Sequence, residues 1–240
     1  MRTSNRCRLL AVMMTVALPW VATDFSPESA ALGQENAASK TYPPGEKVFG
    51  KSYADWSAAW WRWAVAIPKD KSPVRDMTGA FASQGQGGQV WFLAGTLDGS
   101  AERKVTVPAG KALFFPIITT LGALPASKKA PVGMLSDYVK IKMDELRPLE
   151  VTLDGKSLAE GKGYRVESDE FSLTGPEKEA DAAFPGMVGE LRAVSGGYWV
   201  MLQPLPPGEH TLRFRGKAEH KIGPFAVDVT YRLSVTAEKK

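Results

Sequence analysis

Cysteine is almost absent from this chain, with a single one, Cys7, in 240 residues. We predict that residues 1–31 are an export signal. Arg2, Arg6 and Arg8 precede an apolar run of about 14 residues, too short to span a bilayer, and small residues follow it. The exported chain would then contain no cysteine, which excludes disulfides, thiolate metal sites and a cysteine nucleophile from it.

Histidine is also scarce, and the only two, His210 and His220, stand ten residues apart. A metal site usually takes three or four ligands, and no His-x-His or His-x-x-Glu spacing supplies them. Val194–Gly197 resembles half of a nucleophile elbow, but its glycines are expected to serve a turn. Gly85–Gly88 precedes a strand and no helix, so it is not a phosphate-binding loop. We therefore predict no metal and no cofactor.

The excess of positive charge is small. The chain has 30 Lys and Arg against 26 Asp and Glu, and removing residues 1–31 lowers the net charge from +4 to +3. Because these charges are spread along the chain, nucleic acid is not an expected partner. After the signal no segment is apolar enough to cross a membrane, since the best, Ala112–Leu124, is interrupted by Pro116. We expect a secreted or periplasmic protein.

An amphipathic helix is predicted over residues 53–66. Ser52 is a suitable N-cap, and Pro68 disfavours helix in the residue before it. A second helix is predicted over about 134–146, where Leu135, Tyr138, Val139, Met143 and Leu146 form one apolar arc.

Tryptophan is concentrated in the first of these helices, which holds four of the seven in the chain. Trp56, Trp60 and Trp63 have the spacing of one helix face, so we expect them to dock on a sheet. Trp61 points elsewhere. It either covers the end of the fold or offers a binding surface, because a tryptophan ring is both adhesive and able to donate a hydrogen bond.

Short apolar or alternating segments bounded by turn residues predict strands. They are Gln89–Ala94, Lys104–Val107, Lys111–Ile118, Leu149–Leu153, Tyr164–Ser168, Asp169–Thr174 and Tyr198–Leu202. Asp-Gly pairs in Leu97–Ser100 and at Asp154–Gly155 favour tight turns. Gly175–Gly189, with two prolines and many charges, is expected to be an exposed insertion.

The alternation is clearest near the C-terminus. One apolar face is formed by Phe225, Val227, Val229, Tyr231 and Leu233, and another by His210, Leu212 and Phe214. If these two strands pair antiparallel with their wet faces matched, Arg213 lies near Asp228. A register with Arg213 opposite Val227 would contradict this prediction.

Many short strands with two helices, and no regular alternation of strand and helix, favour an all-β-dominated fold. We predict a single domain over residues 51–237, built as a two-sheet antiparallel β-sandwich or jelly roll with two marginal helices. A flexible lead-in over residues 32–50 is expected before it, because that stretch is polar and ends in a Pro-Pro-Gly turn.

The chain resembles an uncharacterised family of secreted bacterial proteins over essentially all of the exported part. The matching residues are Trp60, Trp61 and Trp63, then Asp76–Gly79, Gly85–Gly95, Val107–Pro116, Val151–Gly155, Tyr164–Val166 and Leu205–Gly216. The resemblance implies secretion and a β-rich fold, but no activity or ligand. The family pattern has cysteines where this chain has Ala82 and Val105, so the cross-link that they would form is missing here.

The sequence leaves the function open among three classes. The first is a non-catalytic domain that binds an envelope or extracellular polymer, such as a polysaccharide, or a partner protein. If the Gly85 loop lies near the first helix, its site would be formed by Trp61, Gln84, Gln86, Gln89 and Tyr198, because an aromatic face beside amide groups suits a sugar ring.

The second class is a metal-independent hydrolase of glycans or esters that uses two carboxylates, and the third is a structural envelope protein. The nominal carboxylates are Asp76, Asp137, Glu145, Glu167, Glu170 and Asp228. Surface solvation is the default for each of them.

Overall fold

The computed structural model describes residues 41–97, 99–158, 164–220 and 223–237. The predicted export signal therefore lies outside the described residues. The helices are α1 (Tyr53–Ala66) and α2 (Met134–Met143), with short 3-10 turns at Lys69–Lys71 and Glu179–Asp181. The strands are β1 (Val90–Phe92), β2 (Gly99–Val107), β3 (Ala112–Pro125), β4 (Leu146–Leu153), β5 (Lys156–Ser157), β6 (Arg165–Glu167), β7 (Phe171–Thr174), β8 (Glu190–Leu202), β9 (Gly208–His220) and β10 (Gly223–Val235). Over the described ranges, no helix is both long and apolar enough to cross a bilayer.

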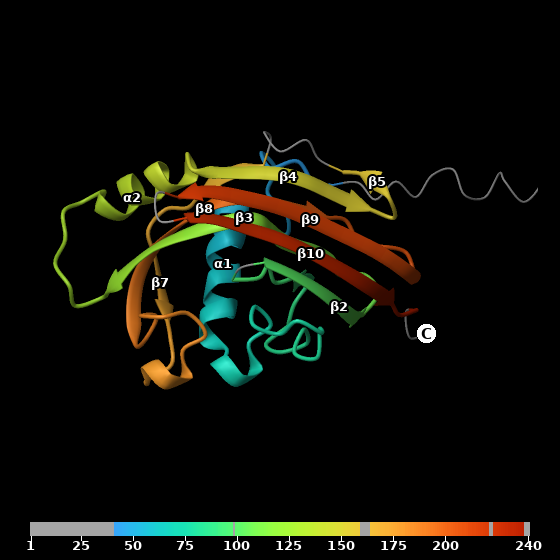
Figure 1. The fold of residues 1–240 in the computed structure, drawn as a ribbon, viewed down its shortest axis with the longest axis horizontal. Coiled ribbons are helices and arrows are strands. Elements are labelled where there is room, and N and C mark those ends of the chain that lie inside the picture. The colour runs from blue at the N-terminus through green and yellow to red at the C-terminus, as the bar shows by residue number, and fades with distance from the viewer. Residues whose placement is uncertain (1–40, 98, 159–163, 221–222, 238–240) are drawn as a thin grey trace, which may run out of the picture. The chain divides into compact units, whose positions relative to one another are not determined.

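The strands form two five-stranded sheets (Figure 1). The central sheet has the order β1-β3-β8-β6, with β7 also paired to β8, and the outer sheet has the order β2-β10-β9-β4-β5. The predicted two-sheet sandwich is confirmed. Both sheets are mixed, however, because β1 runs parallel to β3 and β2 runs parallel to β10. The purely antiparallel prediction is therefore wrong for these two pairs, and a jelly roll is not confirmed.

The central sheet is covered on both faces, as β8 shows. Val200 and Leu202 belong to the core between the two sheets, whereas Trp199 and Met201 pack toward α1 on the opposite face. Because both faces are buried, the strand is apolar at successive positions rather than at alternate ones. The fold therefore has three layers, with α1 on one side, the central sheet in the middle and the outer sheet on the other side.

Helix α1 begins and ends where the sequence predicts. The Ser52 hydroxyl accepts a hydrogen bond from the Asp55 amide at 3.1 Å, and the Asp55 carboxylate accepts one from the Ser52 amide at 3.0 Å. This reciprocal capping box satisfies two donors that the first turn of a helix leaves free.

The predicted stripe of three tryptophans is buried, and each indole donates to a backbone carbonyl. Trp56 bonds to Val48 at 2.9 Å, Trp60 to Leu93 at 3.0 Å and Trp63 to Gln84 at 2.8 Å. The stripe therefore docks α1 on the central sheet through both packing and hydrogen bonds.

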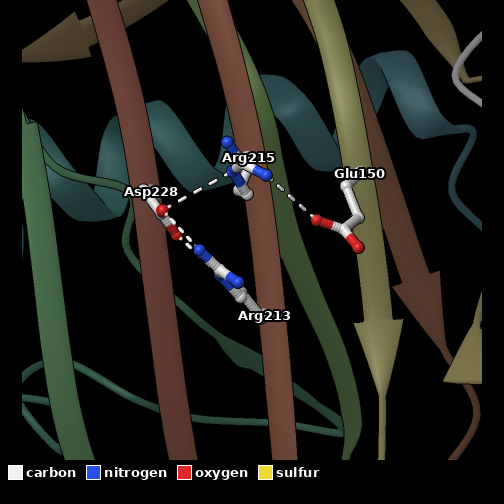
Figure 2. A network of polar contacts seen from close by, with 4 residues as sticks. All are labelled: Glu150, Arg213, Arg215 and Asp228. Atoms are coloured by element: carbon white, nitrogen blue, oxygen red, sulfur yellow. Dashed lines mark hydrogen bonds and ion pairs between the residues drawn. The ribbon is translucent and has the colours of Figure 1, made fainter. Parts of the chain in front are cut away.

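The predicted pairing of the two C-terminal strands is confirmed. Arg213 stands opposite Thr230, and Arg215 stands opposite Asp228. The Arg213 guanidinium reaches diagonally to the Asp228 carboxylate with bonds of 2.9 and 2.7 Å. Arg215 lies 3.5 Å from Asp228 and 3.4 Å from Glu150 of β4, so four charges cross three strands on the wet face of the outer sheet (Figure 2).

Helix α2 is shorter than predicted. It ends at Met143, because Leu146 instead begins β4 and pairs with Ala218 of β9. Leu135 and Val139 are buried as predicted, but Tyr138 is 46% exposed. The residues of the predicted apolar arc therefore do not share one environment. Some form a buried stripe on α2, and the others lie outside that stripe.

Two turn predictions have different outcomes. Asp154 and Gly155 both have positive φ, 51° and 76°, and they connect the paired strands β4 and β5. Asp98, of the other Asp-Gly pair, lies outside the described residues, but the strands before and after it, β1 and β2, do not form a hairpin, because they lie in different sheets. Each of these strands instead pairs in parallel with a strand that is not its neighbour in sequence, β1 with β3 and β2 with β10.

Gly196 and Gly197 lie within β8, so the prediction of a turn there is wrong. A Cβ atom on Gly196 would stand 2.4 Å from a methyl carbon of Val139 in α2. One on Gly197 would stand 2.6 Å from the Ile118 carbonyl oxygen of β3. These glycines therefore let a helix and a strand approach β8 closely.

The ordered fold begins earlier than residue 51. The Tyr42 amide donates to the Met201 carbonyl at 2.8 Å, the Tyr53 hydroxyl donates to the Tyr42 carbonyl at 2.6 Å, and Val48 is buried. The last part of the predicted lead-in is thus packed against α1 and the end of β8. The polar composition of residues 32–50 did not indicate this packing, because only a few residues of the segment take part in it.

Candidate functional site

The structure places Trp61 and Tyr198 on opposite faces of the central sheet. Trp61 is 7% exposed and packs on the α1 side, where its ring centroid lies 5.3 Å from that of Phe184. Tyr198 shares the other face of β8 with Val200 and packs in the core between the sheets. These two side chains therefore belong to separate packing clusters.

The three glutamines lie around the Gly85 loop, which does approach α1. A Cβ on Gly85 would stand 3.1 Å from Trp63, so the loop lies beside Trp63 rather than Trp61. The Gln86 amide donates to the carbonyls of Ala82 and Phe92 and accepts from the Phe92 amide. It holds the loop in place, and both of its amide hydrogens are used.

Gln84 is half-buried and Gln89 is exposed. The structure therefore does not bring the five predicted site residues to one surface. Every described tryptophan, moreover, is 9% exposed or less. No tryptophan in the described part of the chain presents a flat face to a sugar ring.

A pocket of about 310 Å³ lies instead along the edge of β3. Strand β1 pairs with β3 only from Ala112 to Phe114, and no other described strand covers that edge farther along. A β-bulge at Ile117 interrupts the pairing with β8, so that Ile117 and Ile118 both face the outer sheet. The uncovered stretch, Pro116–Leu121, lines the pocket.

Segments far apart in the sequence form the other walls of the pocket. The connection from β1 to β2 contributes Gly95–Leu97, α1 contributes Trp61, and β10 contributes Phe225. The Gly175–Gly189 segment adds Phe184, Pro185 and Met187 to the lining. Apart from Thr96, Thr119 and Thr120, the lining side chains are apolar, so the pocket suits a mainly apolar molecule.

The Gly175–Gly189 segment is not simply an exposed insertion. Its ends meet, because the Gly175 amide donates to the Gly189 carbonyl at 2.9 Å, and Arg75 donates to the Ala183 carbonyl at 2.7 Å. Ala183 is 1% exposed. The segment thus resembles a compact Ω-loop that covers Trp61. Its charged composition indicated an exposed insertion instead.

One buried donor in the pocket lining has no partner. The Trp61 indole nitrogen makes no hydrogen bond, although Trp56, Trp60 and Trp63 all do. Thr119, which also lines the pocket, donates its hydroxyl to the Gly196 carbonyl at 2.8 Å. A buried polar group without a partner is costly, and the indole nitrogens of Trp91 and Trp199 share this state. The Trp61 nitrogen is closed to solvent, so an acceptor on a ligand would reach it only with a shift of the ring.

A buried arginine, which was not predicted from the sequence, lies beside the pocket. Arg103 of β2 is 1% exposed and donates to the carbonyls of Asp76 at 2.7 Å, Ala94 at 2.6 Å and Gly95 at 2.9 Å. It also donates to the Tyr231 hydroxyl at 2.9 Å. Because Gly95 lines the pocket, Arg103 fixes the position of that wall.

Tyr231 completes this polar cluster inside the core. Burial raises its pKa, so the phenol stays protonated and donates to the Ala94 carbonyl at 2.8 Å. Burial also acts to raise the pKa of Asp76, but hydrogen bonds from Phe81 and Thr78 outweigh it and lower that pKa. Asp76 therefore stays ionised near Arg103 and orders the loop before the pocket.

The carboxylates considered for hydrolysis do not line the pocket. Glu145 pairs with Lys142 at 3.1 Å, Glu170 with Arg192 at 3.3 Å and Asp228 with Arg213 at 2.7 Å. Glu167 accepts a hydrogen bond from Ser136, and Asp137 is exposed on α2. Their positions offer no pair of facing acids at this site.

Within the described ranges, no group of three or more His, Cys, Asp and Glu residues is placed to hold a metal ion. His210 has a different role. Its Nδ1 lies 2.8 Å from the Asp154 carboxylate, and its Nε2 lies 3.0 Å from the Pro206 carbonyl oxygen. Since both partners are acceptors, the geometry suits an imidazolium that donates from both nitrogens.

His210 should therefore make the stability depend on pH. Burial opposes its protonation, but the bonds to Asp154 and Pro206 prevail and raise its pKa above 6.5. The stabilisation is complete below pH 6.5 and is lost as the pH rises through the higher pKa of the folded state. We expect a loss of less than about 1 kcal/mol, because Asp154 is partly exposed.

Urea unfolding between about pH 5 and 8 measures this effect. His210→Gln should remove the His210 component of the pH dependence, and Asp154→Asn should reduce it. A pH profile of His210→Gln identical to that of the unmodified protein would contradict the assignment.

Comparison with known proteins gives no functional assignment to this pocket. No protein-family model, no curated protein and no solved structure matches the chain.

Proposed function

We propose that this chain is a non-catalytic binding domain and that its ligand is a small apolar molecule held in the pocket beside β3. The observation that carries the proposal is the cavity of about 310 Å³ with a mainly apolar lining. Ligand pockets typically occupy about 300–1,000 Å³ and combine apolar walls with a few placed polar groups. The domain acts outside the cytoplasm, as the export signal predicted over residues 1–31 implies.

Trp61 is the common element of this proposal and of the binding site expected from the sequence. The polymer hypothesis requires an exposed aromatic face, which suits a sugar ring. The buried indole beside Phe184 instead favours a ligand that enters the pocket. We therefore propose a ligand with an aromatic ring or a short hydrocarbon chain, and with one acceptor oxygen for the Trp61 nitrogen.

A fluorescent apolar probe tests whether the pocket binds. N-phenyl-1-naphthylamine should bind the purified protein saturably, with increased emission. Leu97→Trp places a larger ring at the pocket wall and should weaken this binding at least tenfold. Met77→Trp is the matched control, since Met77 is 45% exposed and is not part of the lining. Unchanged binding by Leu97→Trp, with both variants folded, would reject the pocket as the site.

A second pair of probes tests the role of the indole nitrogen. 2-Naphthaldehyde has an acceptor oxygen, and 2-methylnaphthalene has none. The unmodified protein should prefer the aldehyde, and Trp61→Phe should abolish that preference, because one hydrogen bond contributes about 0.5–1.5 kcal/mol, or roughly two- to tenfold. Equal preference in both proteins would show that Trp61 serves packing alone.

A further inference from the structure

Helix α2 carries two apolar stripes, of which the fold uses only one. Leu135, Val139 and Met143 are buried against β3 and β8. Met134 and Ile141 lie outside that stripe and are 44% and 64% exposed. A helix that needs one apolar face for packing normally has polar residues on the other.

The exposed stripe belongs to a larger apolar surface. Tyr138 is 46% exposed, and Val132, in the loop before the helix, is fully exposed. Seven large apolar residues are exposed in the described part of the chain, and these four lie within ten residues. Such a concentration marks an interaction surface. We call the surface of Val132, Met134, Tyr138 and Ile141 the α2 face.

Positive charge surrounds the α2 face. Residues 126–145 contain four lysines and three acidic residues. With the ion pairs Lys142–Glu145 and Arg165–Asp144 set aside, three lysines remain against Asp137, a local net charge of +2. Lys128, Lys129 and Lys140 are exposed, whereas Lys142 pairs with Glu145 at 3.1 Å. The partner must therefore be apolar in its interior and negatively charged at its surface.

The α2 face is also held rigidly. A Cβ on Gly122 of β3 would stand 3.1 Å from Tyr138, and one on Gly196 of β8 would stand 2.4 Å from Val139. The helix therefore lies directly on two strand backbones. It stands at one end of the sandwich, beside the ends of β4 and β9 (Figure 1). Apolar side chains presented in this way lose little conformational freedom on docking.

We infer that the α2 face docks on the surface of an anionic lipid bilayer. Val132, Met134, Tyr138 and Ile141 enter the boundary between headgroups and acyl chains, and the lysines lie at the level of the phosphate groups. A second copy of the chain is a poorer occupant, because a symmetric contact would bring two clusters of +2 together. This inference is independent of the ligand in the pocket.

Cosedimentation of the purified protein with vesicles tests the inference. Binding is expected to phosphatidylcholine vesicles that contain phosphatidylglycerol and to fall strongly at high salt. The triple variant Lys128→Gln, Lys129→Gln, Lys140→Gln should bind about 100-fold more weakly, since each lysine contributes about 1 kcal/mol near such a surface. Its control replaces the exposed lysines Lys69, Lys71 and Lys104 with glutamine and should bind as the unmodified protein does.

The apolar component is tested separately. Val132→Ser with Ile141→Ser should weaken binding about tenfold or more, because two exposed side chains lose their burial in the bilayer. Met77→Ser is the matched control. Equal binding to vesicles with and without phosphatidylglycerol, or no binding to either, would overturn the inference. So would a concentration-dependent dimer that Val132→Ser with Ile141→Ser abolishes while vesicle binding is absent.

Discussion

Trp60→Ala should lower the free energy of unfolding by about 4 kcal/mol, the range measured for truncated buried aromatics. Trp60 is 2% exposed, and its ring lies 5.2 Å from Trp61, 5.7 Å from Trp63 and 5.5 Å from Trp199, measured between centroids. Its removal would leave a cavity in the middle of the α1 layer and an unpaired carbonyl at Leu93. Urea unfolding followed by circular dichroism measures the change.

Phenylalanine variants separate packing from hydrogen bonding. Trp60→Phe loses part of the ring and the bond to Leu93, whereas Trp91→Phe loses only part of the ring, because the Trp91 nitrogen has no partner. Trp91 is also buried, at 7% exposure, so the two sites are comparable. Trp60→Phe should cost about 1 kcal/mol more than Trp91→Phe. An equal cost would show that the Leu93 bond does not stabilise α1.

Arg103→Met should cost about 3 kcal/mol, although methionine fills a similar volume. The guanidinium satisfies carbonyls of Asp76 and Gly95 that would remain buried without a donor, and each such group costs about 1–3 kcal/mol. Ala94 would still accept from Tyr231. The variant should also bind the naphthylamine probe more weakly, since Gly95 would be released from its position in the pocket wall.

Arg232→Met is the matched control for Arg103. Arg232 also lies on a strand, but its side chain is 53% exposed and pairs with Glu102 at 2.6 Å. Its replacement should change stability by no more than about 0.5 kcal/mol. If Arg103→Met were as stable as the unmodified protein, the carbonyl cluster would not be what holds the 94–95 segment in place.

The features that the sequence predicted well depend on neighbouring residues. Ser52 and Asp55 set the start of α1 through a contact within one turn, and Pro68 limits its end. The alternation of β9 and β10 determines which residues share a face, so the proximity of Arg213 and Asp228 followed from it. Local periodicity is sufficient in such cases because the whole element obeys one pattern.

The features that were not predicted from the sequence depend on contacts between segments that are distant in the chain. Arg103 occupies an inward position of β2 with Ala101 and Val105. In the sequence alone, a charged residue at such a position indicates the end of a strand, because the carbonyl groups that it binds are not known. Likewise, the helical pattern of α1 could not decide whether Trp61 is exposed. Phe184, more than a hundred residues later, covers it.

The candidate site shows the same limit. The sequence indicated Trp61 correctly as the tryptophan outside the docking stripe, and Trp61 is the member of its expected site that lines the pocket. Tyr198 and the three glutamines belong to the predicted site because of their residue types, since no local pattern shows which of them lie near Trp61. The pocket itself arises because β1 stops pairing at Phe114, a consequence of sheet pairing that no local pattern encodes.

Xenon diffraction tests the central claim, that an apolar ligand pocket lies beside β3, most directly. Apolar cavities stay dry and take up xenon, whereas polar ones hold ordered water. In crystals of the protein pressurised with xenon, we expect an anomalous peak between Trp61, Phe184 and Pro116. Leu97→Trp crystals should lack the peak. Ordered water in this space, or no peak in the unmodified protein, would contradict the claim.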